Sequence, residues 1–154
     1  MHVSLICVGK LKRGPEKELS DDYADRFAKT GARLGLRSFN LIEVASGGGP
    51  EAEGERIAAK VPEAAAVIRL DEFGSQLTSK AFAKDLAKRR DTGLSHLCFI
   101  IGGAEGYSDA IRAAYPETLA LGPQTWPHRL VRVMITEQLY RAASLLAGTP
   151  YHKA

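Results

Sequence analysis

Three short loops carry the residue types in this chain that can hold a small ligand. Each follows an apolar run, and they read Leu70-Asp71-Glu72-Phe73-Gly74, Ile101-Gly102-Gly103-Ala104-Glu105-Gly106 and Leu121-Gly122-Pro123-Gln124-Thr125-Trp126. A glycine pair directly after a buried run permits positive φ angles and lets a ligand approach the backbone without a Cβ in the way. A plain tight turn is the alternative interpretation. As a ligand site, these loops offer backbone N–H and C=O groups to an uncharged purine and an amino-acid tail.

A dinucleotide site fits this pattern less well. The G-x-G-x-x-G fingerprint is absent because Ile101 occupies its first glycine position, and no acidic residue follows Gly106 at the spacing that a ribose contact needs. Trp126 either stacks on a ligand or fills the pocket floor, and packing is the commoner role for a large apolar side chain.

Two further residues have side chains suited to acid–base or electrostatic chemistry. His152 titrates near neutral pH, although a solvated tail is the alternative for a histidine so close to the end of the sequence. Arg132 lies in an otherwise apolar helix and needs a partner, because an unpaired buried charge is costly. That partner is a substrate phosphate, a developing anion or a salt bridge in a dimer. Glu137 and Arg141, at i and i+4, form a structural pair.

Strands and helices alternate along the chain. Predicted strands cover residues 3–8, 38–44, 66–71, 96–101 and 118–121. Between them we expect a helix opened by Pro15 with an inner face of Leu19, Tyr23 and Phe27, and a short one through Ile57. The next two helices are capped by Thr78 or Ser79 and by Ser108. This order predicts a three-layer α/β fold with a parallel sheet, built as a single domain over residues 1–154. Ligands bind beyond the carboxyl ends of such strands, where the three loops lie.

The last predicted helix has apolar residues on two sides. Pro127 is expected in its first turn, where a missing N–H costs nothing. One stripe is Val131, Ile135, Leu139, Ala142 and Leu146, and a second set on the far side is Leu130, Met134 and Leu145. Two apolar sides predict two burial partners, the sheet of the same domain and a second copy of the chain.

Composition narrows the class of protein. The chain has 154 residues, with 45% apolar and 25% charged, and its 21 basic and 18 acidic residues give a net charge of +3. That balance is compatible with a nucleic-acid partner without arguing for one. No apolar run reaches the ~20 residues of a membrane helix. Cys7 and Cys98 lie inside strand-like runs without metal-ligand spacing. We therefore expect a cytoplasmic, reduced protein with no metal and no membrane partner.

Four stretches carry a resemblance to a known family. The sequences VGKLK (8–12), IGGAEGYS (101–108), LGPQTWPHRLVRVMITEQLYRA (121–142) and PYHKA (150–154) resemble the bacterial large-subunit rRNA pseudouridine N3-methyltransferases. These are small homodimeric members of the trefoil-knot (SPOUT) superfamily. The motifs occur together, in order, at the family's spacing, although Ala154 stands where an acidic residue is common. The resemblance implies a C-terminal trefoil knot, which is rare among folds.

The resemblance also implies a cofactor and a substrate. S-adenosylmethionine (SAM) would be held by Leu70, by Gly102 and by the loop of Leu121, Gly122, Pro123, Gln124, Thr125 and Trp126. The substrate would be 23S rRNA in the assembled ribosome. Methyl transfer from a sulfonium needs no metal, but N3 of pseudouridine must lose a proton, so a base or an anion-stabilising cation is expected. The candidates for this catalytic role are His152, Tyr151 and Arg132.

Contacts with RNA would begin with basic side chains. Lys10, Lys12, Arg13 and Lys17, together with residues 88–90, can bind phosphates, although each cluster alone is more typical of a solvated face. Two alternatives to the methyltransferase are a nicotinamide- or flavin-dependent enzyme and a ribosome-associated SPOUT protein without methyl-transfer activity.

Overall fold

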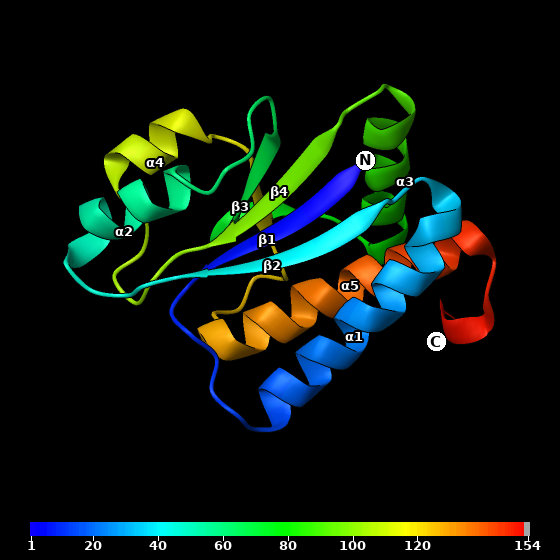
Figure 1. Cartoon of the computed structure of the whole chain (residues 1–154), viewed down its shortest axis with the longest axis horizontal. Coiled ribbons are helices and arrows are strands. Elements are labelled where there is room, and N and C mark those ends of the chain that lie inside the picture. The colour runs from blue at the N-terminus through cyan, green and yellow to red at the C-terminus, as the bar shows by residue number, and fades with distance from the viewer. Residues whose placement is uncertain (153–154) are drawn as a thin grey trace.

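The apolar runs predicted as strands form one parallel sheet in the computed structural model, which describes residues 1–152 (Figure 1). The strands are β1 (His2–Val8), β2 (Ser38–Val44), β3 (Ala66–Gln76), β4 (His96–Ile101) and β5 (Thr118–Ala120), in the sheet order β2-β1-β4-β3-β5. The helices are α1 (Pro15–Gly31), α2 (Gly49–Ala58), α3 (Ser79–Asp91), α4 (Asp109–Ala114) and α5 (His128–Ala147). Two short 3-10 turns, η1 (Ala32–Leu34) and η2 (Pro150–His152), complete the described chain. The predicted α/β class is confirmed.

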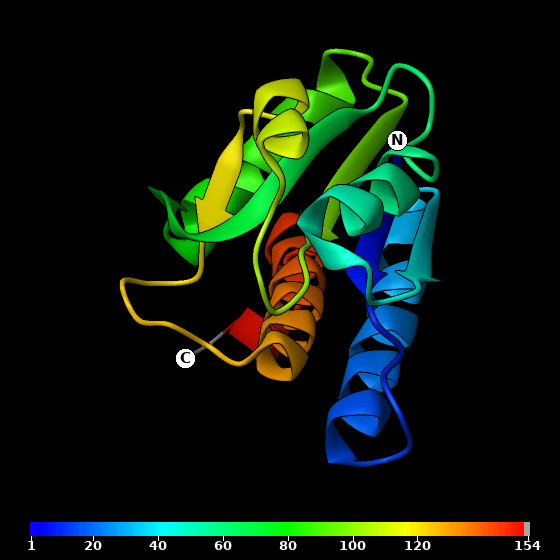
Figure 2. The ribbon, with the colours of Figure 1, turned by 90° about the vertical axis from the view of Figure 1, so that its left-hand side faces the viewer.

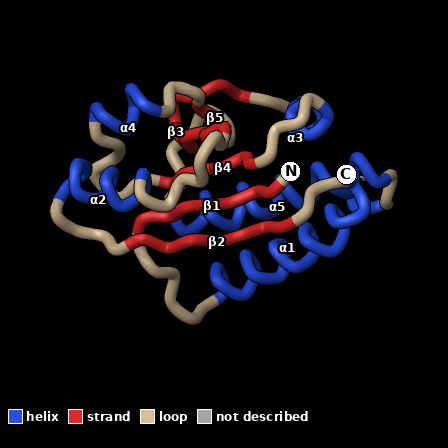
Figure 3. Tube along the Cα trace, turned by 45° about the horizontal axis from the view of Figure 1, so that its top comes forward, coloured by secondary structure: helices blue, strands red, loops and turns tan. Residues whose placement is uncertain are grey.

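Helices cover both faces of the sheet, with α1, α3 and α5 on one side and α2 and α4 on the other (Figures 1 and 3). Because successive residues of a strand point to opposite faces, the inner strands bury both sides. In β4, Phe99 packs into the core under α1, α3 and α5, whereas Cys98 and Ile100 pack into the core under α2 and α4. The sheet is therefore the middle of three layers.

Helix starts follow the predicted caps with one exception. The hydroxyl of Thr78 accepts a hydrogen bond from Ala81 N–H at 3.1 Å, and that of Ser108 accepts one from Ile111 N–H at 3.2 Å. Pro127, however, lies at the N-cap of α5 with an extended ψ of 142° and not within the first turn. The proline thus sets the entry angle of the chain into the helix.

The inner face of α1 differs from the prediction. Phe27 is buried, but Leu19 is 45% exposed and Tyr23 only partly buried, while Ser20 is buried instead. The small side chain of Ser20 allows α1 to pack closely beside α5. Because Ser20 faces inward, the neighbouring Leu19 points away from the sheet. The predicted α5 stripe is correct at its centre, where Ile135 and Leu139 have no exposed surface.

Strand β3 runs further than the sequence suggested. Its pairing with β5 reaches Leu70, breaks, and resumes with Ser75 opposite Leu119, so residues 71–74 leave the ladder and return to it. A Cβ on Gly74 would lie 2.9 Å from the backbone of Leu119, which explains why the chain can re-enter the sheet only with glycine at this point. The excursion places residues 71–74 at the carboxyl end of the sheet.

No described helix is both long and apolar enough to cross a membrane. The trefoil knot and the single-domain organisation of residues 1–154 stay predictions.

Candidate functional site

A hollow of about 450 Å³, which we call the strand-end cavity, opens at the carboxyl ends of β3, β4 and β5. All three predicted loops contribute to it, and the start of α5 adds His128 and Val131. In Figure 2 the loops that follow β4 and β5 both descend toward α5. Six of the predicted cofactor residues line the cavity: Leu70, Gly102, Leu121, Gln124, Thr125 and Trp126. Gly122 and Pro123 belong to the same loop but lie outside the lining.

The loop after β5 is held by its own side chains. Gly122 has a φ of +98°, a backbone conformation that suits glycine. The indole N–H of Trp126 donates to the carbonyl of Leu121 at 2.9 Å, which ties the end of the loop to its beginning. The hydroxyl of Thr125 donates to the carboxylate of Glu72, so the loop is also fastened to the β3 excursion. Trp126 therefore both lines the cavity and fixes the shape of its wall.

The glycine pair after β4 does not adopt the positive φ angles that the sequence suggested. Positive φ occurs at Gly106 but at neither Gly102 nor Gly103. A Cβ on Gly102 would lie 3.0 Å from the ring of Tyr107, and one on Gly103 would lie 2.5 Å from the carboxylate of Glu53. The side chains of Tyr107 and Glu53 leave no room for a Cβ at these two positions. Glycine is therefore required there for space, and not for a positive φ angle.

Acidic side chains border the strand-end cavity. Glu72 and Glu105 belong to its lining, and Asp71 pairs with the buried guanidinium of Arg69 at 3.0 Å. The carboxylate of Asp71 also accepts a hydrogen bond from Phe73 N–H at 3.0 Å, which fixes the excursion of β3. Arg112 and His128 are the basic residues of the lining. The lining therefore offers both acidic and basic side chains to a ligand.

Arg132 lies outside this cavity, which corrects the prediction that its partner is a substrate or a dimer contact. Its guanidinium pairs with Glu43 of β2 at 2.6 Å and donates to the carbonyl of Gly9 at 3.1 Å. Glu43 also accepts from Leu11 N–H at 2.7 Å. Burial raises the pKa of Glu43, but the bonds from Arg132 and Leu11 outweigh that effect and the net shift is downward. Arg132 thus joins α5 to the ends of β1 and β2.

Tyr151 also lies away from the strand-end cavity. Its hydroxyl donates to Glu137 at 2.9 Å, its ring packs 4.4 Å from that of Tyr140, and the guanidinium of Arg141 lies 5.1 Å from its centroid. Burial, followed by hydrogen bonds with Tyr23 and Glu137, raises the pKa of Tyr151. The predicted pair of Glu137 and Arg141 is confirmed at 2.6 Å. The side chain of His152 lies outside the described part of the structure.

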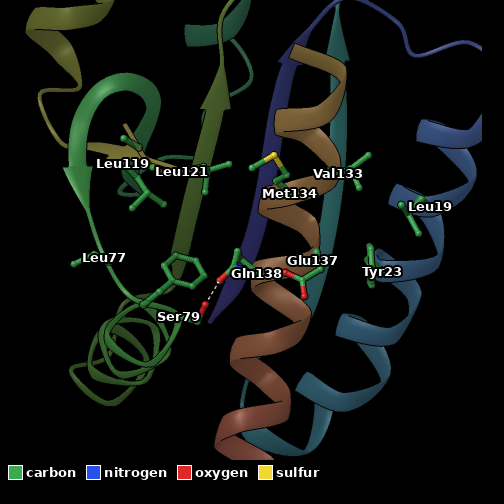
Figure 4. A pocket seen from close by; sticks show the side chains of 13 residues that line it. Leu19, Tyr23, Leu77, Ser79, Leu119, Leu121, Val133, Met134, Glu137 and Gln138 are labelled. Carbon is green, nitrogen blue, oxygen red and sulfur yellow. Dashed lines mark hydrogen bonds between the residues drawn. The ribbon is translucent and has the colours of Figure 1, made fainter. Parts of the chain in front are cut away.

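A second hollow of about 320 Å³, which we call the helix groove, follows α5 (Figure 4). It runs between Leu19 and Tyr23 on α1 and Leu77 and Ser79 on the other side, with Met134, Glu137 and Gln138 of α5 on its floor. The hydroxyl of Ser79 donates to Gln138 at 2.8 Å, the bond drawn in Figure 4. Leu119 and Leu121 line both the helix groove and the strand-end cavity.

Neither thiol nor metal chemistry is built into the described residues. Burial raises the pKa of Cys7 and of Cys98 to about 12 each, so both remain thiols at neutral pH. Within residues 1–152, no three His, Cys, Asp or Glu side chains gather as a metal site would need.

Comparison with known proteins identifies the family. A family model described as "Predicted SPOUT methyltransferase" matches residues 1–152. The chain is 56% identical over 154 residues to a ribosomal RNA large subunit methyltransferase H of Hyphomonas neptunium, and the alignment covers 100% of both chains. The chain belongs to the large-subunit rRNA methyltransferase H family. Its relative in Dinoroseobacter shibae is 48% identical over 155 residues, covering 99% of each chain.

The resemblance inferred from the sequence is therefore confirmed at the level of the family. A solved structure, a putative methyltransferase from Legionella pneumophila in complex with the bound cofactor SAM, aligns with 90% of this chain and 65% of its own at 12% identity and a TM-score of 0.47.

Several residues that shape the site of this methyltransferase have roles that the sequence did not indicate, although Glu72 and Phe73 lie in one of the predicted loops. Tyr107 supports Gly102, Glu53 packs against Gly103, and Glu72 holds Thr125. Phe73, in the lining of the cavity, is 89% exposed. Only Tyr107 had a local signal, since it follows the glycine-rich loop directly, whereas the other partners come together through the tertiary fold.

Proposed function

We propose that this chain transfers a methyl group from SAM to N3 of a pseudouridine in 23S rRNA, and that it does so as a homodimer. The observation that carries this proposal is the strand-end cavity, which is lined by six of the predicted cofactor residues. The chain also belongs to the large-subunit rRNA methyltransferase H family.

The cavity fits SAM in size and in chemistry. Its volume of about 450 Å³ lies within the ordinary range for small-molecule sites. Leu70, Ile101 and Leu121 offer apolar walls to a purine, and the backbone of the three loops offers donors and acceptors. When bound, SAM supplies a methyl group from a sulfonium. Glu72 and Glu105 belong to the lining, and their negative charge would favour a ligand that carries a sulfonium and an ammonium group.

A second copy of the chain is the proposed occupant of the helix groove. Leu130 is 41% exposed and Leu19 is 45% exposed, so the second apolar side of α5 and the outward face of α1 lack cover within the described chain. The groove lies next to the tail, since Glu137 lines it and also holds Tyr151. We propose that association through this surface brings the tail of one subunit to the strand-end cavity of its partner.

The two tail residues then take different roles. Because its pKa is raised, Tyr151 keeps its proton at neutral pH and acts as a hydrogen-bond donor or a packing surface. His152 is the better candidate for the base that removes the N3 proton, since histidine is the side chain best suited to proton transfer at neutral pH. The loops of the cavity would hold the methyl donor in line with the acceptor nitrogen, which is the main requirement of this reaction.

RNA would meet the exposed basic residues near α1. Lys10, Lys12 and Arg13 are exposed, and we propose that they contact phosphates. The two arginines of the second basic cluster support the fold, because Arg89 pairs with Asp85 and Glu117 and Arg90 donates to the carbonyl of Leu34. Lys88, the third residue of that cluster, is exposed and remains a candidate for a phosphate contact. A small basic surface favours a preassembled substrate, so we propose that the enzyme acts on the assembled ribosome in the cytoplasm.

Calorimetry and mass spectrometry test this function. The purified protein is expected to bind SAM with micromolar affinity and not to bind NAD. In a strain that lacks the gene, one modified uridine of 23S rRNA should be lighter by one CH2 unit, and the gene should restore it. Binding of SAM without any change in the rRNA would instead identify a ribosome-associated protein without methyl-transfer activity.

A further inference from the structure

The strand-end cavity opens where β3 and β4 cease to pair. Their ladder runs from Ala66 opposite Leu97 to Arg69 opposite Ile100, and it stops there. On its other side β3 leaves β5 after Leu70 and does not rejoin it until Ser75. Leu70 is therefore the last residue of β3 before the strand loses both neighbours, and it forms one wall of the cavity.

The side chain of Tyr107 fills the gap between the separating strands. Its hydroxyl lies 2.7 Å from the carbonyl oxygen of Leu70 and 2.9 Å from that of Ile100. A phenol has one proton, so it donates to one of these two carbonyl oxygens at a time. The hydroxyl thus takes over the donor role that backbone N–H groups have where the two strands are still paired. Because burial raises the pKa of Tyr107, the proton stays on the oxygen at neutral pH.

The ring of the same residue supports the opposite wall. A Cβ added to Gly102 would lie 3.0 to 3.3 Å from three carbons of the Tyr107 ring, so the glycine backbone rests directly against the ring. The guanidinium of Arg69 lies 5.1 Å from the ring centroid and helps to fix its orientation. One side chain thus contacts both Leu70 and Gly102, two of the residues on which the proposed cofactor site depends.

We propose that Tyr107 is a positioning residue for SAM: it sets the separation between Leu70 and Gly102, and thereby the width of the slot that receives the cofactor. This inference rests on the proposed function. Tyr107 also borders the strand-end cavity, but its hydroxyl faces the carbonyls of Leu70 and Ile100 and not the cavity's reacting groups. Its loss should therefore weaken the binding of SAM and of its demethylated product by the same factor. The methyl-transfer step on bound SAM should change little.

Tyr107→Phe tests the proposal, since it keeps the ring under Gly102 and removes only the hydroxyl. Loss of one buried hydrogen bond predicts a roughly tenfold rise in the dissociation constants of both SAM and S-adenosylhomocysteine. The KM for SAM should rise by a similar factor, while kcat at saturating SAM stays within about threefold. Tyr115→Phe is the matched control: Tyr115 packs into the same core, and within residues 1–152 its hydroxyl has no hydrogen-bond partner. Its SAM affinity should match the wild type.

A second variant tests the contact between Tyr107 and Gly102 by changing the glycine. Gly102→Ala should push the Tyr107 ring away and weaken SAM binding, but in a Tyr107→Leu background it should add little, because the two changes act through one contact. Full additivity would contradict the proposal, as would a Tyr107→Phe protein that melts earlier yet binds SAM as the wild type does. Failure of the wild type to bind SAM at all would overturn the proposed function itself, a distinct outcome.

Discussion

Replacing Arg132 by methionine should destabilise the fold and leave the chemistry of the folded enzyme intact. The guanidinium is buried and pairs with Glu43 at 2.6 Å, and it also donates to the carbonyl of Gly9. Methionine retains much of the length and apolar character of arginine, so the main loss is the charge and its hydrogen bonds. Glu43 would keep only the N–H of Leu11 as a partner.

The size of the effect follows from the burial of the pair. Breaking a fully buried ion pair by removing one partner costs about 3–5 kcal/mol, because the other charge stays behind. The side chain of Glu43 keeps 30% of its exposure, so water can partly solvate it. We therefore expect a loss of about 2–3 kcal/mol. With a urea m-value of about 2 kcal/mol/M for a domain of this size, the unfolding midpoint should fall by roughly 1–1.5 M.

Urea unfolding can be followed by the fluorescence of Trp126, the single tryptophan of the chain. All variants should be compared at one protein concentration, because the stability of the proposed dimer would depend on it. Arg129→Met, an exposed arginine of the same helix, is the control and should change stability by less than about 0.5 kcal/mol. The double variant Arg132→Met with Glu43→Gln removes both charges and keeps an acceptor for Leu11 N–H, so it should recover part of the loss.

The pair also predicts a dependence on pH. Because the pKa of Glu43 is lowered in the folded state, its contribution is complete above the ordinary glutamate pKa of about 4.3 and is lost as pH falls through the folded value. The difference in stability between wild type and Arg132→Met should therefore shrink below about pH 4. The structural role of Arg132 would be refuted by a variant that is as stable as the wild type but has lost methyl transfer, with no recovery in the double variant.

Three other variants probe the loops and the helix groove. Gly103→Ala should lower the melting temperature, because its Cβ would lie 2.5 Å from Glu53, and Glu53→Ala should relieve part of that loss. Binding of SAM should change the fluorescence emission of Trp126, because this residue lines the cavity. Trp126→Phe should weaken SAM binding severalfold, because it removes the hydrogen bond from the indole N–H to the carbonyl of Leu121. An unchanged affinity for SAM would show that this hydrogen bond does not shape the site. Met134→Asp should shift the sedimentation coefficient to that of a monomer, whereas Leu41→Asp, on strand β2 away from the groove, should remain dimeric.

The sequence predicted the strands and the loops of the site well, for a physical reason. A strand buried on both faces must be apolar at almost every position, so β1 and β4 are visible as continuous runs. Parallel strands end at the same edge of a sheet, so the stretches that begin at Leu70, Ile101 and Leu121 had to lie near one another. Local pattern was enough for both predictions.

Contacts between distant parts of the chain were not predictable in this way. Glu43, the partner of Arg132, is 89 positions away in sequence, and nothing in the pattern around either residue indicates the other. The sequence pattern after β4 does not indicate that Tyr107 and Glu53 supply the atoms that exclude a Cβ at Gly102 and Gly103. Leu19 follows helical spacing correctly and is nevertheless exposed, because the packing of α1 beside α5 determines which face turns inward.

Leu119 and Leu121 stand between the strand-end cavity and the helix groove and have surface in both. Any displacement of this partition by an occupant of one hollow changes the shape of the other. If a second copy of the chain occupies the helix groove as proposed, affinity for the methyl donor and affinity between subunits are coupled, and by thermodynamic reciprocity each alters the other by the same factor. Diluting the protein should consequently change its apparent affinity for the methyl donor, although no ligand-binding residue has been altered.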